Sequence, residues 1–278
     1  MTSTRSSWAA PSPALPRLSN LDQFTAFAHL LADAAGRVIL PYFESELEVE
    51  SKADNSPVTN ADREAEEAMR GLIEQEFPDH AIYGEEFGIS LCGPQGELTD
   101  DKIQYTWVLD PIDGTKAFIA GRKEWGTLIA FCADGVPILG ILNQPATGER
   151  WVGVRGKLTT LNGDIIETRP CVSLAEAELS TTSASYFTPE QAKRVVPLAQ
   201  SVRKTVADGD CYAYGLLAKG ARDIVLDAGL KPYDILALVP IVEGAGGTIT
   251  AWDGQPITLT HFNTALAIGD STLTVSLT

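Results

Sequence analysis

The fold of this chain is organised around the stretch Trp107-Val108-Leu109-Asp110-Pro111-Ile112-Asp113-Gly114-Thr115. An apolar strand ends here in two carboxylates, which are followed by a glycine-threonine turn. Two anions held this close together repel each other unless a cation neutralises them, and a hard divalent metal ion is the simplest such cation. We therefore predict a metal site at the end of this strand.

The turn after the two acids predicts a place for phosphate. Pro111 fixes the backbone between the acids, and Gly114 lets the chain bend tightly enough to expose successive backbone N–H groups. If residues 115–119 begin a helix, its positive end faces the metals, which suits a phosphate group. A metal ion beside a phosphate indicates phosphoryl chemistry.

Length and composition exclude several classes of protein. The 278 residues, 44% of them hydrophobic, suffice for one large layered domain or two moderate ones. The longest apolar runs, 135–142 and 235–242, fall well short of the roughly 20 residues that cross a bilayer, so we expect core elements and no membrane span. A net charge of -16 argues against nucleic acid or an anionic membrane as partner.

The cysteines and the N-terminus bear on the compartment. Cys92, Cys132, Cys171 and Cys211 lie far apart and form no C-x-x-C pair, which indicates neither a zinc cluster nor a disulfide framework. We therefore expect a reducing, cytoplasmic setting. Residues 1–20 are rich in Ser, Pro and Arg and contain no acid, which faintly resembles an organelle transit segment, but we predict a disordered tail.

Hydrophobic periodicity divides the rest of the chain into two halves. In residues 21–170, amphipathic helices precede a run of strands, a pattern typical of helices packed on an antiparallel sheet. In residues 171–278, strands and helices alternate, and the last predicted helix starts at Asp234 and ends at Gly244. We expect the first half to carry most metal ligands and the second to supply Asp234 and the residues that select the substrate.

The main elements expected from this pattern are helices at about 21–42, 60–77 and 210–219, and strands at 81–83, 126–131, 137–142, 150–154, 224–226, 248–252 and 265–269. A further helix should be opened by a capping box of Thr188 and Gln191.

Carboxylates at the ends of predicted elements are the candidates for the metal site. They are Asp62, Glu85, Asp110, Asp113 and Asp234. Any one of them could be a surface acid, and Asp62 could equally be a helix N-terminal acid, but five in matching contexts favour a common site. Ligands that are all oxygen select Mg²⁺ or Mn²⁺ over zinc.

Other catalytic chemistries are poorly supported. The histidines His29, His80 and His261 are isolated, no Ser or Cys lies in a G-x-S-x-G elbow, and there is no Walker loop. The glycines of residues 244–247 follow a predicted helix instead of a strand, which indicates a tight helix end and not a dinucleotide site.

Four motifs, taken together, resemble the signatures of the inositol monophosphatase family: Thr59-Asn60-Ala61-Asp62, Gly84-Glu85-Glu86, Asp110-Pro111-Ile112-Asp113-Gly114-Thr115, and Tyr233-Asp234 followed by Glu243-Gly244-Ala245-Gly246-Gly247. They occur in the family's order and approximate spacing over residues 21–270. The resemblance implies an α+β or α/β layered fold, the α-β-α-β-α sandwich shared with fructose-1,6-bisphosphatase. It also implies Mg²⁺-dependent, lithium-sensitive hydrolysis of a phosphate monoester, usually by a homodimer.

The resemblance also implies a set of metal ligands. Glu85, Asp110 and the backbone carbonyl of Ile112 would hold a first Mg²⁺, while Asp110, Asp113 and Asp234 would hold a second. Glu85 would also touch a third, weaker ion and so take part in catalysis. Mn²⁺ is a possible substitute for Mg²⁺.

For the remaining catalytic roles, the resemblance implies that Asp62 and the Thr115 hydroxyl orient the attacking water and help to deprotonate it. The backbone N–H groups of Gly114 and Thr115 would hold the phosphate oxygens.

Within the family, the histidinol-phosphate phosphatase branch is the most similar. Residues 113–119, 125–130 and 209–218 resemble that branch. Relatives specific for inositol carry Trp before the last aspartate and small residues after it, whereas this chain has Tyr233 before it and Ile235-Leu236 after it. The resemblance therefore favours L-histidinol phosphate as the substrate.

A physical reason also favours this substrate, which carries an ammonium and an imidazole. Asp210 and Asp227 fall, with Asp113, where the family contacts the organic part of the substrate, and acids suit a cationic ligand. Asp210 could equally be a helix N-cap, and Asp227 could merely end a strand.

Two alternatives remain open. One is a phosphatase of the same family that acts on inositol phosphate, a sugar or a nucleotide. The other is a regulatory protein of the family that binds RNA or polymerase. The acidic balance of the chain and its complete set of metal ligands both count against this second alternative.

Overall fold

The computed structural model describes residues 21–43, 49–51, 57–91, 104–207 and 209–277. The tail predicted at residues 1–20 and the cysteine Cys92 lie outside these ranges. The other cysteines are Cys132, Cys171 and Cys211, and each is a free, buried thiol.

In the described ranges the helices are α1 (Leu21–Phe43), α2 (Asn60–Glu76), α3 (Thr115–Ile119), α4 (Pro189–Ser201), α5 (Asp210–Ala218), α6 (Pro232–Ile235) and α7 (Leu238–Gly244), with short 3-10 turns η2 (Leu174–Glu176) and η3 (Ala184–Tyr186). The strands are β1 (Val49–Ser51), β2 (Pro57–Thr59), β3 (Ala81–Gly84), β4 (Gly88–Leu91), β5 (Tyr105–Asp113), β6 (Gly126–Ala133), β7 (Val136–Gln144), β8 (Glu149–Val154), β9 (Thr160–Leu161), β10 (Asp164–Ile165), β11 (Glu178–Thr181), β12 (Lys204–Ala207), β13 (Ile224–Ala228), β14 (Thr248–Thr250) and β15 (Thr264–Ile268).

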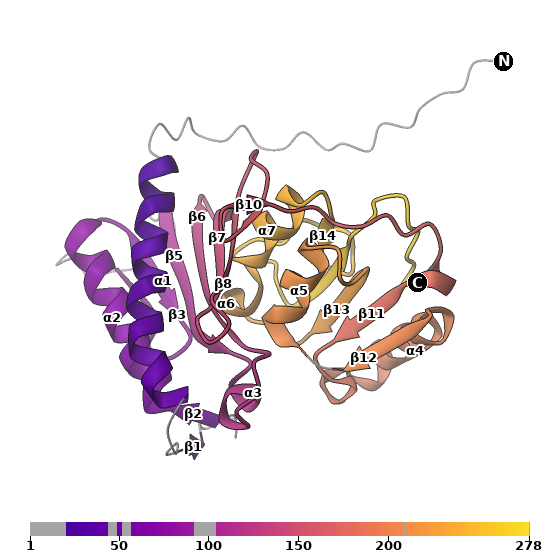
Figure 1. Ribbon diagram of the computed structural model, residues 1–278, viewed down its shortest axis with the longest axis horizontal. Coiled ribbons are helices and arrows are strands. Elements are labelled where there is room, and N and C mark those ends of the chain that lie inside the picture. The colour runs from indigo at the N-terminus through magenta and orange to yellow at the C-terminus, as the bar shows by residue number, and fades with distance from the viewer. Residues whose placement is uncertain (1–20, 44–48, 52–56, 92–103, 208, 278) are drawn as a thin grey trace.

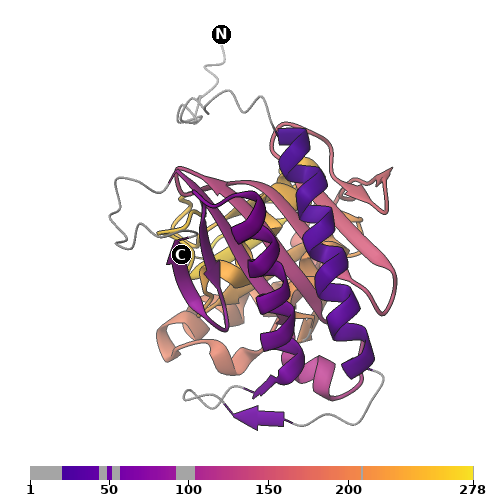
Figure 2. The same ribbon diagram turned by 90° about the vertical axis from the view of Figure 1, so that its left-hand side faces the viewer.

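These elements form layers that alternate helix and sheet (Figure 1). Helices α1 and α2 lie side by side over one face of the first sheet (Figure 2), and α5 to α7 lie between that sheet and the second one. Helix α4 covers the outer side of the second sheet. The α-β-α-β-α order expected from the sequence is therefore confirmed.

The first sheet, as far as the structure describes it, has eight strands in the order β10-β9-β8-β7-β6-β5-β3-β4. The sequence predicts an antiparallel sheet here, but β3 and β5 run parallel. Strand β4, which was not predicted, lies between β3 and β5 in the sequence and pairs antiparallel with the outer edge of β3. Strand β5 pairs with the other edge of β3 and runs in the same direction as β3. Short edge strands with few buried side chains, such as β4, leave little periodic signal.

The second sheet has the order β12-β11-β13-β15-β14 in the described residues. Its β12, β11 and β13 are parallel, and β15 and β14 add antiparallel strands. The edge strand β12 was also not predicted, because its side chains are mostly exposed. Residues 166–177 connect the two sheets, and the boundary predicted at residue 170 falls within this connection.

An aromatic cluster packs α1 against the strand that carries the central motif. The ring of Phe131 on β6 lies 4.3 Å from the ring of Phe24 and 4.6 Å from the indole of Trp107, measured between centroids. Phe131 and Trp107 are fully buried. This packing fixes β5 and therefore the position of the acids at its end.

The single helix predicted from Asp234 to Gly244 is wrong. The chain forms two short helices instead, and α6 begins at Pro232, where the missing N–H of proline costs nothing. Pro240 lies in the first turn of α7. It has no N–H to donate to Leu236 four residues earlier, and its ring would clash with that carbonyl in a continuous helix.

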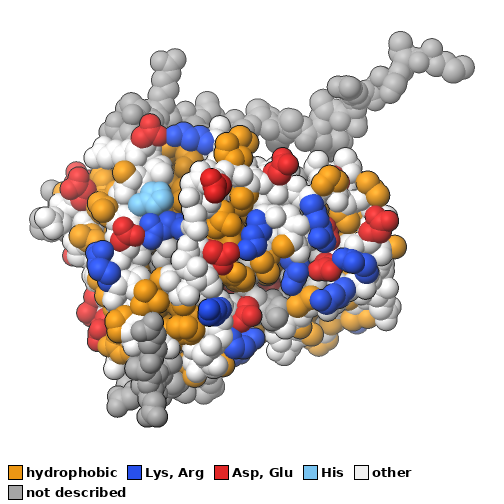
Figure 3. All heavy atoms as spheres, viewed as in Figure 1, with side chains coloured by type: hydrophobic (Ala, Val, Ile, Leu, Met, Phe, Trp, Pro, Cys, Tyr) orange, Lys and Arg blue, Asp and Glu red, His pale blue; other side chains and the backbone are white. Residues whose placement is uncertain are grey.

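Both signs of charge occur on the molecular surface. On the face shown in Figure 3, basic and acidic side chains are interspersed with apolar ones. None of the helices in the described part of the chain combines the length and the hydrophobicity that crossing a bilayer requires.

The aromatic cluster predicts a large effect of one core substitution. Phe131→Ala should lower the free energy of unfolding by about 3–5 kcal/mol, because it removes a buried ring and leaves a cavity. Urea unfolding of the metal-free protein would measure this loss. Val196→Ala, at a side chain on α4 that is 50% exposed, is the control and should change stability by less than about 0.5 kcal/mol. A loss below about 1 kcal/mol for Phe131→Ala would contradict the packing described.

Candidate functional site

The five acids proposed from the sequence meet in the structure as two neighbouring groups. Asp110 and Asp113 from β5 and Asp234 from α6 each place a carboxylate oxygen within 4.8 Å of the others. Asp62 from α2 forms a second group with Glu85 and its neighbour Glu86. Glu85 also acts electrostatically on Asp110 and Asp234, so the two groups adjoin.

An irregularity in β5 allows Asp110 and Asp113 to face the same site. Side chains of a regular strand alternate, so residues three apart point to opposite faces. Asp110 pairs with Leu128 and Asp113 with Gly126, so that β5 advances three residues while β6 advances two. The extra residue is a β-bulge, which turns Asp113 back toward the side of Asp110. The Thr127 hydroxyl donates to the Pro111 carbonyl over 2.8 Å and stabilises the bulge.

Backbone N–H groups orient Asp113 at the end of β5 and Asp234 in α6. Oδ2 of Asp113 accepts a 2.6 Å hydrogen bond from the N–H of Cys211 in the first turn of α5. Oδ2 of Asp234 accepts a 2.8 Å bond from the N–H of Lys231, which precedes α6. The site therefore depends on contacts between the two halves of the chain.

Burial and mutual repulsion raise the pKa of each acid in the first group. Burial, followed by the charges of Glu85, Asp113 and Asp234, raises the pKa of Asp110 well above its usual value. Burial also raises the pKa of Asp113, with the charges of Asp210 and Asp234 adding to it. Burial and neighbouring acids raise the pKa of Asp234 to about 7. The group thus resists carrying its full negative charge unless a cation is present.

The donor set fits a hard divalent cation. Oδ1 of Asp110 is buried and has no hydrogen-bond partner, which is costly for a carboxylate oxygen inside a protein. The other donors of the group are also carboxylate oxygens, the ligands that Mg²⁺ and Mn²⁺ prefer. These acidic clusters could therefore bind metal.

The predicted phosphate-binding turn has the expected backbone. Gly114 has a φ of 85° and precedes α3, and a Cβ there would lie 2.8 Å from the carbonyl oxygen of Glu124. Both facts require glycine at this position. The Thr115 hydroxyl donates to the carbonyl of Ile112 over 3.0 Å, so two residues with predicted roles contact each other.

A cavity of about 330 Å³ opens beside the acids. The predicted site residues that line it are Glu85, Asp113, Asp210, Asp227 and Asp234. Asp210 is the first residue of α5 and not its N-cap, which is Gly209. Burial, followed by the charge of Asp227, raises the pKa of Asp210 to about 6.

Asp227 lies within β13 and does not end a strand. Its Oδ1 accepts bonds from the N–H of Thr182 over 2.7 Å and from the Thr181 hydroxyl over 3.3 Å. Its Oδ2 accepts a 2.9 Å bond from the Tyr214 hydroxyl. These bonds give Asp227 a structural role on the cavity wall, and its contact with substrate stays a prediction.

Sequence reasoning missed several residues of the site. Glu86 was quoted within a motif but was not proposed as a ligand. Lys116 at the start of α3 donates a 2.8 Å bond to the hydroxyl of Tyr186, which lines the cavity from the other half of the chain. No short-range pattern could have paired residues 70 positions apart.

Comparison with known proteins agrees with this geometry. A model of the inositol monophosphatase family matches residues 20–274. The chain belongs to the inositol monophosphatase family.

Relatives of the family cover most of the chain. It is 48% identical over 261 residues to the bifunctional phosphatase IMPL2, chloroplastic, of Arabidopsis thaliana, covering 91% of this chain and 73% of the relative. It is 35% identical over 227 residues to a histidinol-phosphatase of Chlorobaculum parvum, covering 81% and 84%. A solved inositol monophosphatase from Zymomonas mobilis is 46% identical, with a TM-score of 0.81, covering 92% of this chain and 96% of that one. The chain is therefore a phosphatase, a hydrolase of phosphate esters.

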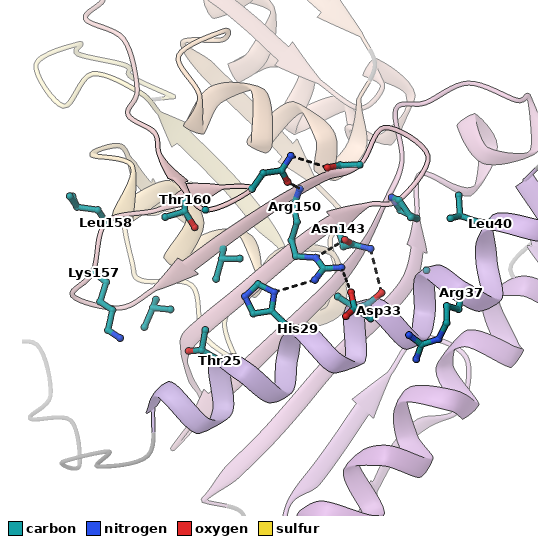
Figure 4. Close-up of a pocket in the computed structure, with 18 residues that line it drawn as sticks. Thr25, His29, Asp33, Arg37, Leu40, Asn143, Arg150, Lys157, Leu158 and Thr160 are labelled. Atoms are coloured by element: carbon teal, nitrogen blue, oxygen red, sulfur yellow. Dashed lines mark hydrogen bonds and ion pairs between the residues drawn. The ribbon is translucent and has the colours of Figure 1, made fainter.

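A larger hollow, of about 720 Å³, lies between α1 and β8 (Figure 4), and no residue of the two acidic groups lines it. Arg150 donates to Asp33 over 2.6 Å and to Asn143 over 2.8 Å, and it lies 3.1 Å from Nδ1 of His29. Asp33 is the only acid among the described residues that line this hollow, and Arg150 neutralises it. The hollow therefore lacks the donors of a metal site.

The raised pKa of Asp234 predicts that the group of Asp110, Asp113 and Asp234 destabilises the metal-free protein. Between an unfolded pKa near 4 and the folded value of about 7, the folded state holds more protons, so this acid makes stability fall as the pH rises through that window. Asp234→Asn should therefore stabilise the metal-free protein at pH 8, by up to about 4 kcal/mol, and have little effect at pH 4.

Thermal unfolding in EDTA at the two pH values would measure the effect. Asp164→Asn, which makes the same change at an exposed position on β10, is the matched control and should have little effect at either pH. Equal stability of Asp234→Asn and wild type at pH 8 would contradict the repulsion described.

Proposed function

We propose that this phosphatase hydrolyses L-histidinol phosphate to L-histidinol and phosphate, a step of histidine biosynthesis, using two or three Mg²⁺ ions. The observation that carries the proposal is the meeting of the five predicted acids in two adjoining groups. Three of them, Glu85, Asp113 and Asp234, line a cavity whose wall also carries Asp210 and Asp227, which would face the organic part of the substrate. An acidic wall favours a substrate whose organic part is cationic.

The residues that would hold the metal ions follow the resemblance to the family. Glu85, Asp110 and the Ile112 carbonyl form the first set, and Asp110, Asp113 and Asp234 form the second. Bound ions would clamp the phosphate, lower the pKa of the attacking water and stabilise the leaving oxygen. Mn²⁺ could replace Mg²⁺, since both accept oxygen ligands.

The chain's own residues would orient the water and the phosphate. Asp62 and the Thr115 hydroxyl would orient the water and help to deprotonate it, with the Asp62 carboxylate taking up the proton as the water oxygen bonds to phosphorus in line with the ester oxygen. The P–O ester bond then breaks, and the alcohol takes up a proton. Gly114 precedes α3 and Thr115 is its first residue. The N–H groups of both would hold the phosphate oxygens, since the first N–H groups of a helix have no acceptor within it.

The choice of substrate is supported by Asp210 and by relatives. Asp210 is half-buried at the start of α5, lines the cavity and could pair with the ammonium group of histidinol phosphate. A histidinol-phosphatase is among the relatives at 35% identity. The identity of 46% to an inositol monophosphatase favours inositol phosphate as the second candidate.

Other expectations also belong to this proposal. The homodimer rests on resemblance to the family alone. We infer a cytoplasmic location from the free cysteines, although the Arabidopsis relative is named as chloroplastic. We expect neither nucleic acid nor membrane as a partner, because the net charge is -16.

A substrate comparison tests the proposal directly. With Mg²⁺, phosphate release from L-histidinol phosphate should exceed release from inositol 1-phosphate in kcat/KM, and EDTA should abolish both. Asp113→Asn should lower kcat by more than about 100-fold, because it alters a direct ligand. Faster hydrolysis of inositol 1-phosphate would support the second candidate and refute the first.

Asp210→Asn tests recognition of the cation. At pH 8, where Asp210 is ionised, the variant should raise KM for histidinol phosphate by about 10-fold or more, the worth of a charged hydrogen bond. KM for inositol 1-phosphate, which has no positive charge, should change little or fall. Equal changes for the two substrates would refute the role of Asp210.

A further inference from the structure

Glu66 and Arg70 lie on the face of α2 that also carries Asp62. The three residues are four apart, so their side chains follow one another along the helix. Glu66 is fully buried and Arg70 is 8% exposed. Neither residue belongs to the predicted metal or substrate set, yet burying charged side chains this deeply is costly without partners.

The partners of Glu66 are backbone groups of the turn after β3. Its Oε2 accepts a 2.7 Å bond from the N–H of Glu86, and its Oε1 accepts a 3.2 Å bond from the N–H of Phe87. Arg70 Nε donates to the same Oε1 over 2.8 Å. The carboxylate thus accepts two bonds from the turn that carries Glu85 and one from its own helix.

Arg70 extends the same contact to the strand beyond the turn. Its Nη1 donates to the Ser90 hydroxyl over 2.7 Å, and its Nη2 donates to the carbonyl of Gly88. One guanidinium therefore neutralises Glu66 and joins α2 to Gly88 and Ser90 of β4.

Gly84 makes this approach possible. A Cβ at position 84 would lie 1.8 Å from Oε1 of Glu66, far inside any tolerable contact. The glycine of the Gly84-Glu85-Glu86 motif is needed here because the buried carboxylate occupies the space of a side chain.

The backbone of Glu85 is held from the opposite side as well. Its N–H donates to the carbonyl of Leu109 over 3.1 Å, one residue before Asp110 on β5. The turn that carries Glu85 and Glu86 is therefore fixed between the strand that bears Asp110 and the helix that bears Asp62.

We propose that Glu66 is a positioning residue for the metal centre. By binding the N–H groups of Glu86 and Phe87, it sets the distance of the Glu85 and Glu86 carboxylates from Asp62 and Asp110, and so sets metal affinity. This inference rests on the ligand role that the proposed function gives to Glu85, but not on the identity of the substrate. Residues that orient metal ligands typically change affinity 10–100-fold when they are altered.

Glu66→Gln is the decisive substitution, because it keeps the size and shape of the side chain. A glutamine has one acceptor oxygen where the carboxylate has two, and its NH₂ group must face a donor. If the glutamine oxygen keeps the bonds from Arg70 and Phe87, the NH₂ group faces the N–H of Glu86, and these two donors cannot form a hydrogen bond. Glu67→Gln makes the same change at the next residue of α2, where the side chain is exposed, and is the matched control.

Calorimetric titration of the metal-free proteins with Mn²⁺ alone gives a readout that does not depend on activity. Glu66→Gln should raise the dissociation constant by about 10–100-fold, while Glu67→Gln should leave it within about 2-fold of wild type. Glu66→Asp, which keeps the charge on a shorter side chain, should fall between Glu66→Gln and wild type. Wild-type affinity in a folded Glu66→Gln protein would overturn the proposal.

Hydrogen exchange of the wild-type protein provides a test that needs no variant. The amides of Glu86 and Phe87 should be protected in EDTA, because a buried carboxylate binds them without metal. Rapid exchange at both amides would overturn the proposal even if Glu66→Gln failed to fold. If the wild-type protein binds Mn²⁺ but does not hydrolyse histidinol phosphate, the proposed substrate is refuted and the role of Glu66 is unaffected.

Discussion

Repulsion between buried carboxylates is the constraint on which the rest of the site depends. The side chain of Asp110 is buried away from water, and the charges of three other acids act on it. Packing of the surrounding aromatic and aliphatic side chains holds these acids together against their repulsion. An arrangement that is unfavourable for the empty protein thereby becomes favourable for binding a divalent cation, since the carboxylates need no reorganisation to surround it.

Two local irregularities turn a regular sheet into this arrangement. The bulge at Pro111 directs two acids of one strand to one side, and the turn after β3 brings Glu85 and Glu86 to the neighbouring edge. Both features have a buried polar side chain bound to their backbone. Thr127 provides it for the bulge, and Glu66 provides it for the turn. The residues that define the chemistry thus rest on others that never face the cavity.

The sequence predicts much of this fold, because the strongest signals are local. The apolar stripe of α1, the capping box at Thr188 and the strand before Asp110 are each visible within a few residues, and the structure has all three. The acids were recognisable because each ends or begins an element. Their meeting was predictable only through the order of the motifs, since no spacing rule links Asp62 with Asp234.

The features that were missed have different physical causes. Pro240 was read as part of one helix, although its ring forces a break between α6 and α7. The edge strands β4 and β12 lack a buried face, so they carry little periodic signal. Asp227 was assigned to the end of a strand, but its bonds to Thr182 and Tyr214 hold it inside β13. Such partners are known only when the chain has folded.

The position of Asp234 after all strands of the first sheet in the sequence has a consequence for synthesis of the protein. A polypeptide leaves the ribosome N-terminus first, so α1, α2 and the whole eight-stranded sheet emerge before this aspartate has been made. A nascent chain therefore lacks one member of its acidic cluster when the strands of the first sheet have already been made. The group of Asp110, Asp113 and Asp234 is therefore incomplete while the first sheet folds, so the apolar packing of that sheet has to hold Asp110 and Asp113 in place before Asp234 arrives.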